Sequence, residues 1–363
     1  MNNIVITGGG TGGHTFAAIA IVERLKEKFN DISIIYIGSK NGLEKNTCEK
    51  IEYIDYKEIS TGKFRRDFDF RNFFDFFRFL KGILGAWKIL GEKNFNFVLS
   101  TGGFVSLPVV IAAYLKKTPV IVHEQTSIPG LANKIAFKLS KKILLSYKID
   151  GISNMNSKTV LFGNPVRRLV SYGFNNWINK NTKQKSDKPI LFVTAGANGS
   201  LIFNNFVFEN IKWLKNNFFV ILQSGKHITN VEFIEKMKIE KKEFPNIIYD
   251  FIEAEVLGEI YAQEPILLAR SGAGTITDII NFKLASILIP LKNSAGNEQL
   301  FNANILFKHG ASLIIEEHDF KSDKVRQALL NAAINCKKIK NALEKFPSFK
   351  DSNIEMVFSE FFI

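Results

Sequence analysis

Short apolar runs alternate with longer stretches of helical periodicity along most of this chain. Six apolar runs in the first half are expected to form strands: Asn3–Thr7, Ser33–Ile37, Asn96–Ser100, Pro119–His123, Lys142–Leu145 and Thr159–Phe162. A strand–helix alternation of this kind predicts a parallel sheet with helices on both faces. Because ligands of such sheets lie at the carboxyl ends of the strands, the residues that follow each strand are the first candidates for a site.

A polar stretch at residues 175–188, rich in Asn, Lys and Ser, interrupts this pattern, which then restarts. The second set of expected strands is Pro189–Thr194, Phe218–Gln223, Asn246–Phe251, Pro265–Ala269, Ser286–Pro290 and Ser312–Ile315. The chain is therefore predicted to fold as two Rossmann-like α/β halves facing a cleft. After Pro347, Ser352 and Glu355 predict a capping box for a last helix, whose apolar face must dock on one of the two halves.

Composition fits a globular chain that is long enough for two cores. The sequence has 363 residues, of which 46% are hydrophobic and 23% charged. The excess of 48 Lys and Arg over 35 Asp and Glu gives a net charge of +13, which favours anionic partners or reflects a solvated basic surface. Cys48 and Cys336 form no metal or redox spacing, so a reducing, cytosolic compartment is expected. Neither a signal peptide nor an apolar run of the roughly 18 residues that a membrane span needs is expected.

The first glycine loop, residues 8–14, lies between an expected strand and a helix start. Glycines allow a close approach of the backbone, and the free N–H groups of a helix N-terminus favour a negative charge. The loop satisfies the dinucleotide fingerprint, but the second strand ends in Gly38-Ser39-Lys40, with no carboxylate for a ribose. NADP, with Ser39 and Lys40 on its 2′-phosphate, remains an alternative. The helix dipole should lower the pKa of His14 and favour the neutral base, unless His14 only caps the helix.

A second strand–turn–helix candidate is Arg270 to Asp278. The amides of residues 273–275 would form another anion site, and Asp278 is placed to accept two hydroxyls of a ribose. The alternative is a plain turn in which Thr275 caps the helix and Asp278 complements its dipole. A second glycine cradle in the same chain favours a ligand.

Other polar groups also follow expected strands. Glu124 ends a strand within His123-Glu124-Gln125, Arg167 could clamp a diphosphate, and the Gln299 amide could read sugar hydroxyls. Each has a plainer alternative, namely a structural hydrogen-bond network, a surface arginine and a polar helix start. Asp67-Phe68-Asp69 matches a metal-binding DxD but lacks a supporting third ligand.

The stretch from Phe64 to Leu90 interleaves aromatic and basic residues. It holds more apolar side chains than one buried helical face requires, which indicates an interfacial element on anionic lipid rather than a core helix with a basic outer side. The candidate membrane residues are Phe73, Phe77, Leu80, Leu84 and Trp87, and the flanking cations include Arg65, Arg66, Arg71, Arg78, Lys81 and Lys88.

The order of motifs along the chain is more specific than any one of them. The motifs are GGGTGGH (8–14), STGGFVSLP (100–108), HEQTSIPGLANK (123–134), GNPVR (163–167), RSGAGTITD (270–278) and NEQ…NA (297–303). Together they resemble the MurG family over nearly the whole chain. This family contains peripheral membrane glycosyltransferases that add N-acetylglucosamine to lipid I in peptidoglycan synthesis. The resemblance implies the GT-B fold, with an acceptor and membrane-docking domain at 1–165, a UDP-sugar domain at 166–340, and a last helix at 341–363 that packs back on the first domain.

The resemblance also implies roles for residues. Asp278 would bind the ribose, Gln299 the sugar, Arg167 the nucleotide, and the backbone of Ile252 the uracil. His14 is the candidate catalytic base, with Glu124 as the runner-up. The implied substrate-binding set is Thr11, Gly12, Gly13, Thr126, Asn133, Arg167, Ala197, Ile252, Ala273, Gly274, Thr275, Asp278 and Gln299.

The implied reaction is an inverting, metal-independent transfer from UDP-N-acetylglucosamine to the 4-hydroxyl of lipid I, giving lipid II, with no cofactor. The implied partners are both substrates, an anionic membrane surface and other cell-wall synthesis proteins, but no nucleic acid. The protein would lie peripherally on the cytoplasmic face of the plasma (inner) membrane, and act in cell-wall biogenesis, cell shape and cell division.

The sequence departs from the family pattern at several positions. Ala197 stands where Ser is usual, Asp278 is a methylene shorter than the usual Glu, and Thr126 replaces an Asn. Phe104 replaces a common Tyr, and Glu298 stands where His or Gln is usual. Another GT-B glycolipid glycosyltransferase, an NADP-dependent oxidoreductase and a non-catalytic membrane adaptor are the alternative functions.

Overall fold

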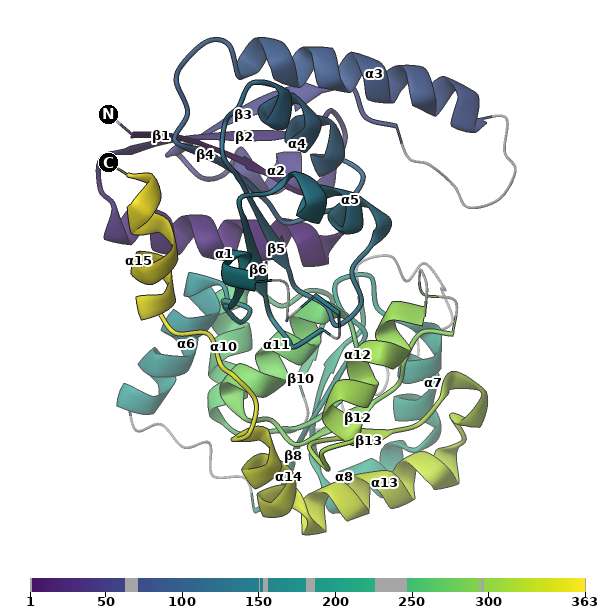
Figure 1. Cartoon of the computed structure of the whole chain (residues 1–363). Helices are drawn as coiled ribbons and strands as arrows, with labels where there is room; N and C mark the ends of the chain where they lie inside the picture. The colour runs from purple at the N-terminus through teal and green to yellow at the C-terminus, as the bar shows by residue number, and fades with distance from the viewer. Residues whose placement is uncertain are drawn as a thin grey trace. The chain divides into compact units, whose positions relative to one another are not determined.

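The chain divides into two compact units (Figure 1). A computed structural model describes residues 2–62, 71–149, 151–152, 156–180, 187–225, 247–292, 294 and 297–362. Unit 1 comprises Met1–Arg167 and Pro347–Ile363, and unit 2 comprises Arg168–Phe346. The boundaries expected at 165/166 and 340/341 therefore shift to 167/168 and 346/347. Arg167 stays with unit 1 because its guanidinium stacks on Phe16, and α14 (Cys336–Leu343) stays with unit 2, where the Lys283 ammonium donates to the Leu343 carbonyl at 3.0 Å.

Unit 1 contains a parallel sheet, in the order β3-β2-β1-β4-β5-β6-β7. Its strands are β1 (Asn2–Thr7), β2 (Ile32–Ser39), β3 (Ile54–Ile59), β4 (Phe97–Ser100), β5 (Val120–Glu124), β6 (Lys142–Leu145) and β7 (Thr159–Leu161). Its helices are α1 (Gly12–Lys28), α2 (Leu43–Cys48), α3 (Arg71–Ile89), α4 (Ser106–Leu115), α5 (Leu131–Leu139) and α15 (Ser352–Phe358), with 3₁₀ turns η1 (Asn156–Lys158) and η4 (Ser359–Phe361).

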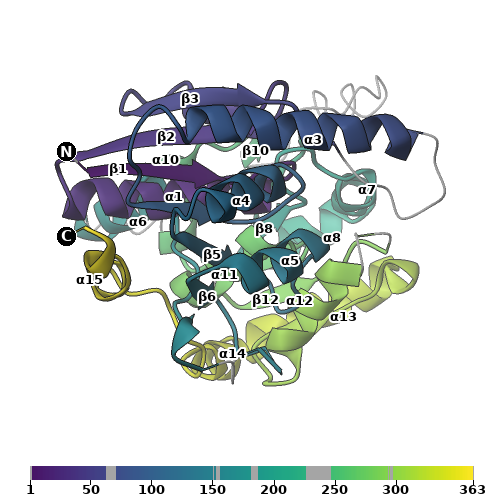
Figure 2. The ribbon, with the colours of Figure 1, turned by 45° about the horizontal axis from the view of Figure 1, so that its top comes forward.

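Alternate residues of the strands of unit 1 supply two cores, one on each face of the sheet. Ile4 and Ile6 of β1 belong to the core that includes residues of α1 and α15. Val5, between them, belongs to the core that includes residues of α4 and α5. This two-sided burial explains why the strands are nearly continuous apolar runs. Figure 2 shows α3 along the outside of unit 1, beside α4.

Unit 2 repeats the architecture, with a parallel sheet in the order β10-β9-β8-β11-β12-β13. Its strands are β8 (Ile190–Thr194), β9 (Phe219–Gln223), β10 (Ile247–Tyr249), β11 (Ile266–Ala269), β12 (Ser286–Leu288) and β13 (Leu313–Ile314). Its other helices are α6 (Arg168–Asn179), α7 (Leu201–Glu209), α8 (Ile211–Asn217), α10 (Ala254–Ala262), α11 (Ala273–Phe282), α12 (Glu298–Phe307) and α13 (Ser322–Ile334), with the 3₁₀ turn η3 (Glu317–Asp319).

The predicted α/β fold with two parallel sheets is confirmed, and each of the twelve expected strands corresponds to a strand of the structure. The prediction missed β3, an edge strand that pairs only with β2 among the described residues. Only Ile54 and Ile59, at its two ends, are buried. Its middle carries Asp55, Lys57 and Glu58, so it lacks the apolar run by which the other strands were recognised.

The last helix, α15, packs on α1 within unit 1. Its Phe358 ring lies 5.4 Å from that of Phe97 in the core. The predicted capping box is wrong, because α15 begins at Ser352 itself and no side chain caps it. The acidic side chains instead join the helices: Arg24 Nε lies 3.3 Å from an Asp351 oxygen, and Lys28 Nζ lies 2.7 Å from a Glu355 oxygen.

Each sheet has a point at which the strand order reverses. In unit 1 this switch point lies between β1 and β4, and in unit 2 it lies between β8 and β11. The crevice outside the carboxyl ends of these strands is where open α/β sheets bind ligands. The loops after β1 and β4, and those after β8 and β11, are therefore the places to look for a site in each unit.

Candidate active site

The loop after β1 presents unused backbone amides. The first bond within α1 runs from the Thr15 N–H to the Thr11 carbonyl, at 3.2 Å. The amides of residues 12–14 come before it, so the helix does not use them. Gly10 has a φ of +84°, which glycine adopts without strain. The loop therefore offers free amides at the switch point, and binding of a substrate by Thr11, Gly12 and Gly13 stays a prediction.

His14, in the first turn of α1, faces the loop after β4 and the end of β5. Its Nδ1 lies 2.8 Å from the Thr101 carbonyl oxygen and also contacts the Gln125 side-chain amide. The Thr101 hydroxyl in turn donates to the His14 carbonyl at 2.9 Å. The pKa of His14 is lowered, the direction predicted, but the main cause is burial rather than the helix dipole. The neutral imidazole is thus the favoured form near pH 7.

Glu124, the runner-up base, is buried at the end of β5 and holds a loop together. Its carboxylate accepts hydrogen bonds from the Thr126 N–H at 2.9 Å, the Thr126 hydroxyl at 2.6 Å and the Asn133 amide at 2.7 Å. A carboxylate that accepts several bonds from fixed donors is stabilised as the anion and organises its surroundings. This geometry favours His14 over Glu124 as the base. It also places Thr126 and Asn133 together, while their contacts with a substrate stay a prediction.

A second buried carboxylate, which the sequence gave no signal for, lies under the first glycine loop. Glu44 of α2 is fully buried and accepts bonds from the Ser39 hydroxyl at 2.5 Å, the Ser39 N–H at 3.2 Å and the Gly10 N–H at 3.4 Å. The Ser39 hydroxyl is therefore engaged by a carboxylate. A 2′-phosphate placed there would meet this carboxylate, which disfavours the NADP alternative.

Arg167 lies at the end of unit 1, after β7, where it stacks on α1. Its guanidinium carbon is 4.7 Å from the centre of the Phe16 ring, two residues beyond His14. A planar guanidinium stacked on an aromatic ring keeps its N–H edge available for a bidentate anion contact.

The loop after β11 in unit 2 repeats the amide arrangement. The first bond within α11 runs from the Ile276 N–H to the Gly272 carbonyl, at 3.1 Å. The amides of Ala273, Gly274 and Thr275 come before it and are not used by the helix. The helix begins at Ala273 with Gly272 as its N-cap residue, so Thr275 is not the cap.

Asp278 and Gln299 are both tied to neighbouring elements of unit 2. The Tyr261 hydroxyl of α10 donates to an Asp278 carboxylate oxygen at 3.0 Å. The Gln299 side-chain oxygen accepts from the Leu291 N–H at 3.0 Å, and its carbonyl accepts from the Ser271 hydroxyl at 2.7 Å. Tyr261 carries no sequence signal, because nothing in the pattern of α10 distinguishes it from a core aromatic.

The remaining candidates of unit 2 are placed as follows. Ala197 is exposed in the loop between β8 and α7 and can offer only its backbone to a ligand. Ile252 is buried between β10 and α10. Arg270 fixes these loops: it pairs with Glu317 at 2.8 Å and donates to the Ile289 carbonyl at 3.1 Å.

Helix α3 carries the predicted membrane residues on one exposed stripe. Phe73 is 63% exposed and Leu84 64%, and Phe77, Leu80 and Trp87 are also exposed. They therefore do not form the buried face of a core helix. Of the cations, Arg78, Lys81 and Lys88 are exposed. Arg65, Arg66 and the Asp67-Phe68-Asp69 motif lie outside the described residues. No group of three potential metal-ligating side chains occurs in the described part of the chain.

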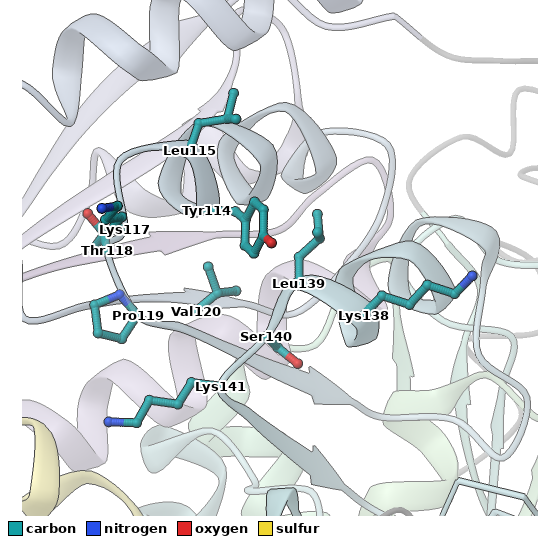
Figure 3. A pocket seen from close by; sticks show the side chains of 10 residues that line it. All are labelled: Tyr114, Leu115, Lys117, Thr118, Pro119, Val120, Lys138, Leu139, Ser140 and Lys141. Atoms are coloured by element: carbon teal, nitrogen blue, oxygen red, sulfur yellow. The ribbon is translucent and has the colours of Figure 1, made fainter.

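A basic pocket of about 530 Å³ opens where α4 and α5 end (Figure 3). It is lined by Tyr114, Leu115, Lys117, Thr118, Pro119, Val120, Lys138, Leu139, Ser140 and Lys141. These residues surround the amino ends of β5 and β6, whereas His14, Glu124 and Gln125 lie at the carboxyl edge. The pocket is therefore not the predicted active site. Lys116, between the lining residues Leu115 and Lys117, places its ammonium 4.5 Å from the centre of the Trp87 ring of α3.

Comparison with known proteins identifies the family. Residues 4–145 match the glycosyltransferase family 28 N-terminal domain, and residues 190–355 match the C-terminal domain of the same family. The chain belongs to glycosyltransferase family 28. The first matched segment contains β1 to β6 of the unit 1 sheet except the first residues of β1, the second contains the whole sheet of unit 2, and both include the switch-point loops.

Family 28 relatives of known name cover nearly the whole chain. The UDP-N-acetylglucosamine--N-acetylmuramyl-(pentapeptide) pyrophosphoryl-undecaprenol N-acetylglucosamine transferase of Clostridium tetani is 36% identical over 359 residues, or 98% of this chain and 97% of the relative. The protein of the same name from Clostridium perfringens is 35% identical, over 94% of this chain and 93% of the relative. The predicted resemblance to the MurG family is thereby confirmed, and the protein is a glycosyltransferase.

Solved structures show the same fold at lower identity. Acinetobacter baumannii MurG has a TM-score of 0.75 and 20% identity, and covers 99% of this chain and 100% of its own. UGT71G1 of Medicago truncatula, solved with UDP-glucose, has a TM-score of 0.65 and 11% identity, over 99% and 98% of the two chains. At these identities the likeness concerns the fold, which is the GT-B arrangement of two Rossmann-like domains.

Proposed function

We propose that the protein transfers N-acetylglucosamine from UDP-N-acetylglucosamine to the 4-hydroxyl of lipid I, giving lipid II. The observation that carries this proposal is the 36% identity to the Clostridium tetani transferase over 98% of the chain. The name of that relative states the donor, UDP-N-acetylglucosamine, and the acceptor, N-acetylmuramyl-(pentapeptide) pyrophosphoryl-undecaprenol, which is lipid I. The two switch-point loops support it, since each unit offers unused amides where a diphosphate can bind.

The donor is assigned to unit 2. The amides of residues 273–275, at the N-terminus of α11, bind the diphosphate of UDP. Asp278 accepts the ribose hydroxyls, Gln299 contacts the sugar, and the backbone of Ile252 contacts the uracil. Ala197 contributes a backbone N–H where a serine would add a hydroxyl.

The acceptor and the proton transfer are assigned to unit 1. The 4-hydroxyl oxygen of the acceptor attacks the anomeric carbon of the donor sugar, and the proton of that hydroxyl passes to Nε2 of His14. The bond between the anomeric carbon and the β-phosphate oxygen breaks, and UDP leaves with the bonding electrons. Attack opposite the leaving group converts the α-linked donor into a β1→4 product. The amides of residues 12–14 bind the acceptor diphosphate.

Negative charge on the leaving UDP is assigned to protein groups rather than to a cation. The α11 amides are fixed donors for it, and a prearranged donor stabilises a developing charge without reorganisation. A contact of the Arg167 guanidinium with the nucleotide stays a prediction. EDTA is therefore expected to leave the transfer rate unchanged. A rate that falls with EDTA and returns with Mg²⁺ would contradict this assignment.

The protein is proposed to bind the cytoplasmic membrane surface peripherally through α3. Among the described residues, no helix is both long and apolar enough to cross a bilayer. The exposed stripe from Phe73 to Trp87 lies on the same helix as exposed cations, and the Lys116 ammonium lies 4.5 Å from the centre of the Trp87 ring. Apolar side chains beside cations are the combination that binds an anionic interface.

The function is tested by incubating the protein with UDP-N-acetylglucosamine and lipid I, followed by product analysis. Formation of lipid II with one UDP released per product is expected. Transfer to diacylglycerol but not to lipid I would support another GT-B glycolipid glycosyltransferase instead. A rise in melting temperature with NADPH but not with UDP would support the oxidoreductase.

Membrane binding is tested by sedimentation with vesicles of neutral and anionic lipid. Burial of one large apolar side chain contributes about 1.5–3 kcal/mol, so replacing Phe73, Phe77 and Leu84 by Ser should weaken binding by at least about 10³-fold. The matched control is Ile334→Ser on α13, an apolar residue that is 82% exposed in unit 2. Equal loss in the control variant, or no loss in the triple variant, would contradict the assignment to α3.

A further inference from the structure

The side-chain amide of Gln125 faces His14 with its nitrogen, and in this orientation the amide makes no proper hydrogen bond to the ring. Gln125, at the end of β5, is buried, and its amide nitrogen approaches Nδ1 of His14. The Thr101 carbonyl oxygen lies 2.8 Å from the same Nδ1. A carbonyl oxygen can only accept a hydrogen bond, so Nδ1 carries the ring proton. Two donors, Nδ1–H and the amide NH₂, would then face each other.

The other end of the amide is also unsatisfied. The Gln125 Oε1 atom is buried and has no hydrogen-bond partner among the described residues. A 180° turn of the amide exchanges its oxygen and nitrogen and moves no other atom. It places Oε1 against Nδ1–H, which removes the donor–donor contact and gives the buried oxygen a partner. Both anomalies thus have one solution.

We propose that Gln125 is a positioning residue, whose side-chain carbonyl, together with the Thr101 main-chain carbonyl, accepts the Nδ1–H of His14 and so keeps Nε2 as the proton-accepting nitrogen. The inference rests on the proposed function only in giving Nε2 the acceptor's proton. Two carbonyl dipoles on Nδ1–H also stabilise the imidazolium that forms when Nε2 takes this proton. Because both partners are neutral, they do this without holding His14 in the charged form at rest.

The titration of His14 must be distinguished from that of the other ionisable groups near it. His123, on β5, has a pKa lowered to about 4, mainly by burial and in part by the charge of His14, so the signals of both histidines are followed together. The Glu124 carboxylate, one residue before Gln125, is held by Thr126 and Asn133. The Glu44 carboxylate of α2 lies under Gly10 and is held by Ser39.

The test is the protonation state of His14, read by long-range ¹H–¹⁵N NMR on the full-length protein. The chain has five histidines, so the His14 signals are assigned by their loss in His14→Ala. At neutral pH the wild-type spectrum should show a protonated Nδ1 and an unprotonated Nε2. A protonated Nε2 in the wild-type protein would overturn the proposal.

Two substitutions of Gln125 by side chains of similar length distinguish a positioning role of this residue from a packing role. Gln125→Glu replaces the neutral acceptor by a carboxylate and should raise the pKa of His14 by about one unit or more. Gln125→Met removes the acceptor, and should lower this pKa, admit the other tautomer and reduce kcat about 10-fold or more, with KM for UDP-N-acetylglucosamine unchanged. A His14 pKa and tautomer that are the same in all three proteins would overturn the proposal.

Matched controls keep folding and function apart. Gln263→Met in unit 2 applies the same change to another partly buried glutamine and should leave the His14 signals unmoved. A melting temperature for Gln125→Glu close to that of the wild type shows that the fold is kept. If the NMR result is as expected but lipid II is not formed, the proposed function fails and the pairing of Gln125 with His14 stands.

Discussion

The switch point of unit 1 and the switch point of unit 2 each present the free amides of a helix N-terminus, but the side chains around them differ. In both, a loop leads from the carboxyl end of a central strand into a helix whose first amides are unused. Around the first lie the half-buried His14 and the buried ionisable side chains of His123, Glu124 and Glu44. Around the second lie Asp278 and Gln299, whose hydrogen bonds run to Tyr261 and to the backbone.

This difference teaches how one fold divides two tasks. A parallel sheet with a helix N-terminus supplies an anion site wherever it occurs, because the amides and the dipole come from the backbone. Proton transfer needs a side chain whose pKa suits it, which burial provides for His14 in unit 1. We infer that unit 2 binds the donor nucleotide, and that unit 1 binds the acceptor and supplies the base that takes its proton.

The largest effect is expected for His14→Ala. Loss of a general base reduces kcat by about 10²- to 10⁴-fold, while the affinity for UDP should not change, since UDP is assigned to unit 2. Steady-state release of UDP gives kcat, and calorimetric titration gives the affinity. The control is His309→Ala, an exposed histidine of unit 2. An undiminished kcat in His14→Ala would show that His14 is not the base, and that unit 1 does not differ from unit 2 by supplying it.

Asp278→Ala should show the opposite signature. Hydrogen bonds to a charged group contribute about 1.5–3 kcal/mol, so the affinity for UDP should fall about 10- to 100-fold while binding of lipid I is unaffected. Titration with UDP and with 2′-deoxy-UDP measures the loss. The wild-type preference for UDP should disappear in the variant. A preference that survives would remove Asp278 from the ribose site.

The pH dependence of stability should differ between the units. The pKa of His123 is about 4 in the folded protein and about 6.5 when unfolded, so the unfolded chain binds more protons between these values. The contribution of His123 to the free energy of unfolding of unit 1 is therefore fully present above pH 6.5. It is lost as the pH drops toward 4, by at most about 1.4 kcal/mol per pH unit. The lowered pKa of His14 acts in the same direction.

Hydrogen exchange at pH 7 and pH 5, corrected for intrinsic rates, measures this difference. Strands of unit 1 should lose protection relative to those of unit 2, and His123→Asn should reduce the loss. Equal losses in both units would show that the buried histidines do not control the acid sensitivity.

The smallest effect is expected for Tyr261→Phe. The variant keeps the ring, which packs 5.2 Å from that of Phe282, but loses the hydroxyl that donates to Asp278. A neutral hydrogen bond contributes about 0.5–1.5 kcal/mol, so UDP affinity should fall about 2- to 10-fold, with kcat nearly unchanged. Tighter binding of UDP in the variant would mean that Tyr261 withholds Asp278 rather than orienting it.

The fold was largely readable in advance because its strands are buried on both faces. Such strands become continuous apolar runs, as at Ile4, Val5 and Ile6, and glycine loops mark where they turn into helices. β3 was not predicted, because an edge strand does not need a continuous apolar run. The candidate residues after strands were found for the same reason, since the carboxyl edge follows from strand order.

The partners of those residues could not be read from the chain. Tyr261 contacts Asp278 from 17 positions away in the sequence, and Thr101 and Gln125 contact His14 from 87 and 111 positions away. Glu44 contacts Gly10 of the first glycine loop from 34 positions away. No local pattern records such a contact, because it depends on how helices settle on the sheet.

The sequence by itself determined two parallel sheets, two amide cradles and an aromatic–basic helix, because each of these arises from local periodicity and glycine placement. Only the tertiary structure decided which polar side chains are engaged with one another. It joined Glu124 to Thr126 and Asn133, and placed the stripe of α3 outside the core. The physical reason is that burial and hydrogen-bond partners, which set the pKa and orientation of a side chain, come from elements far apart in the chain.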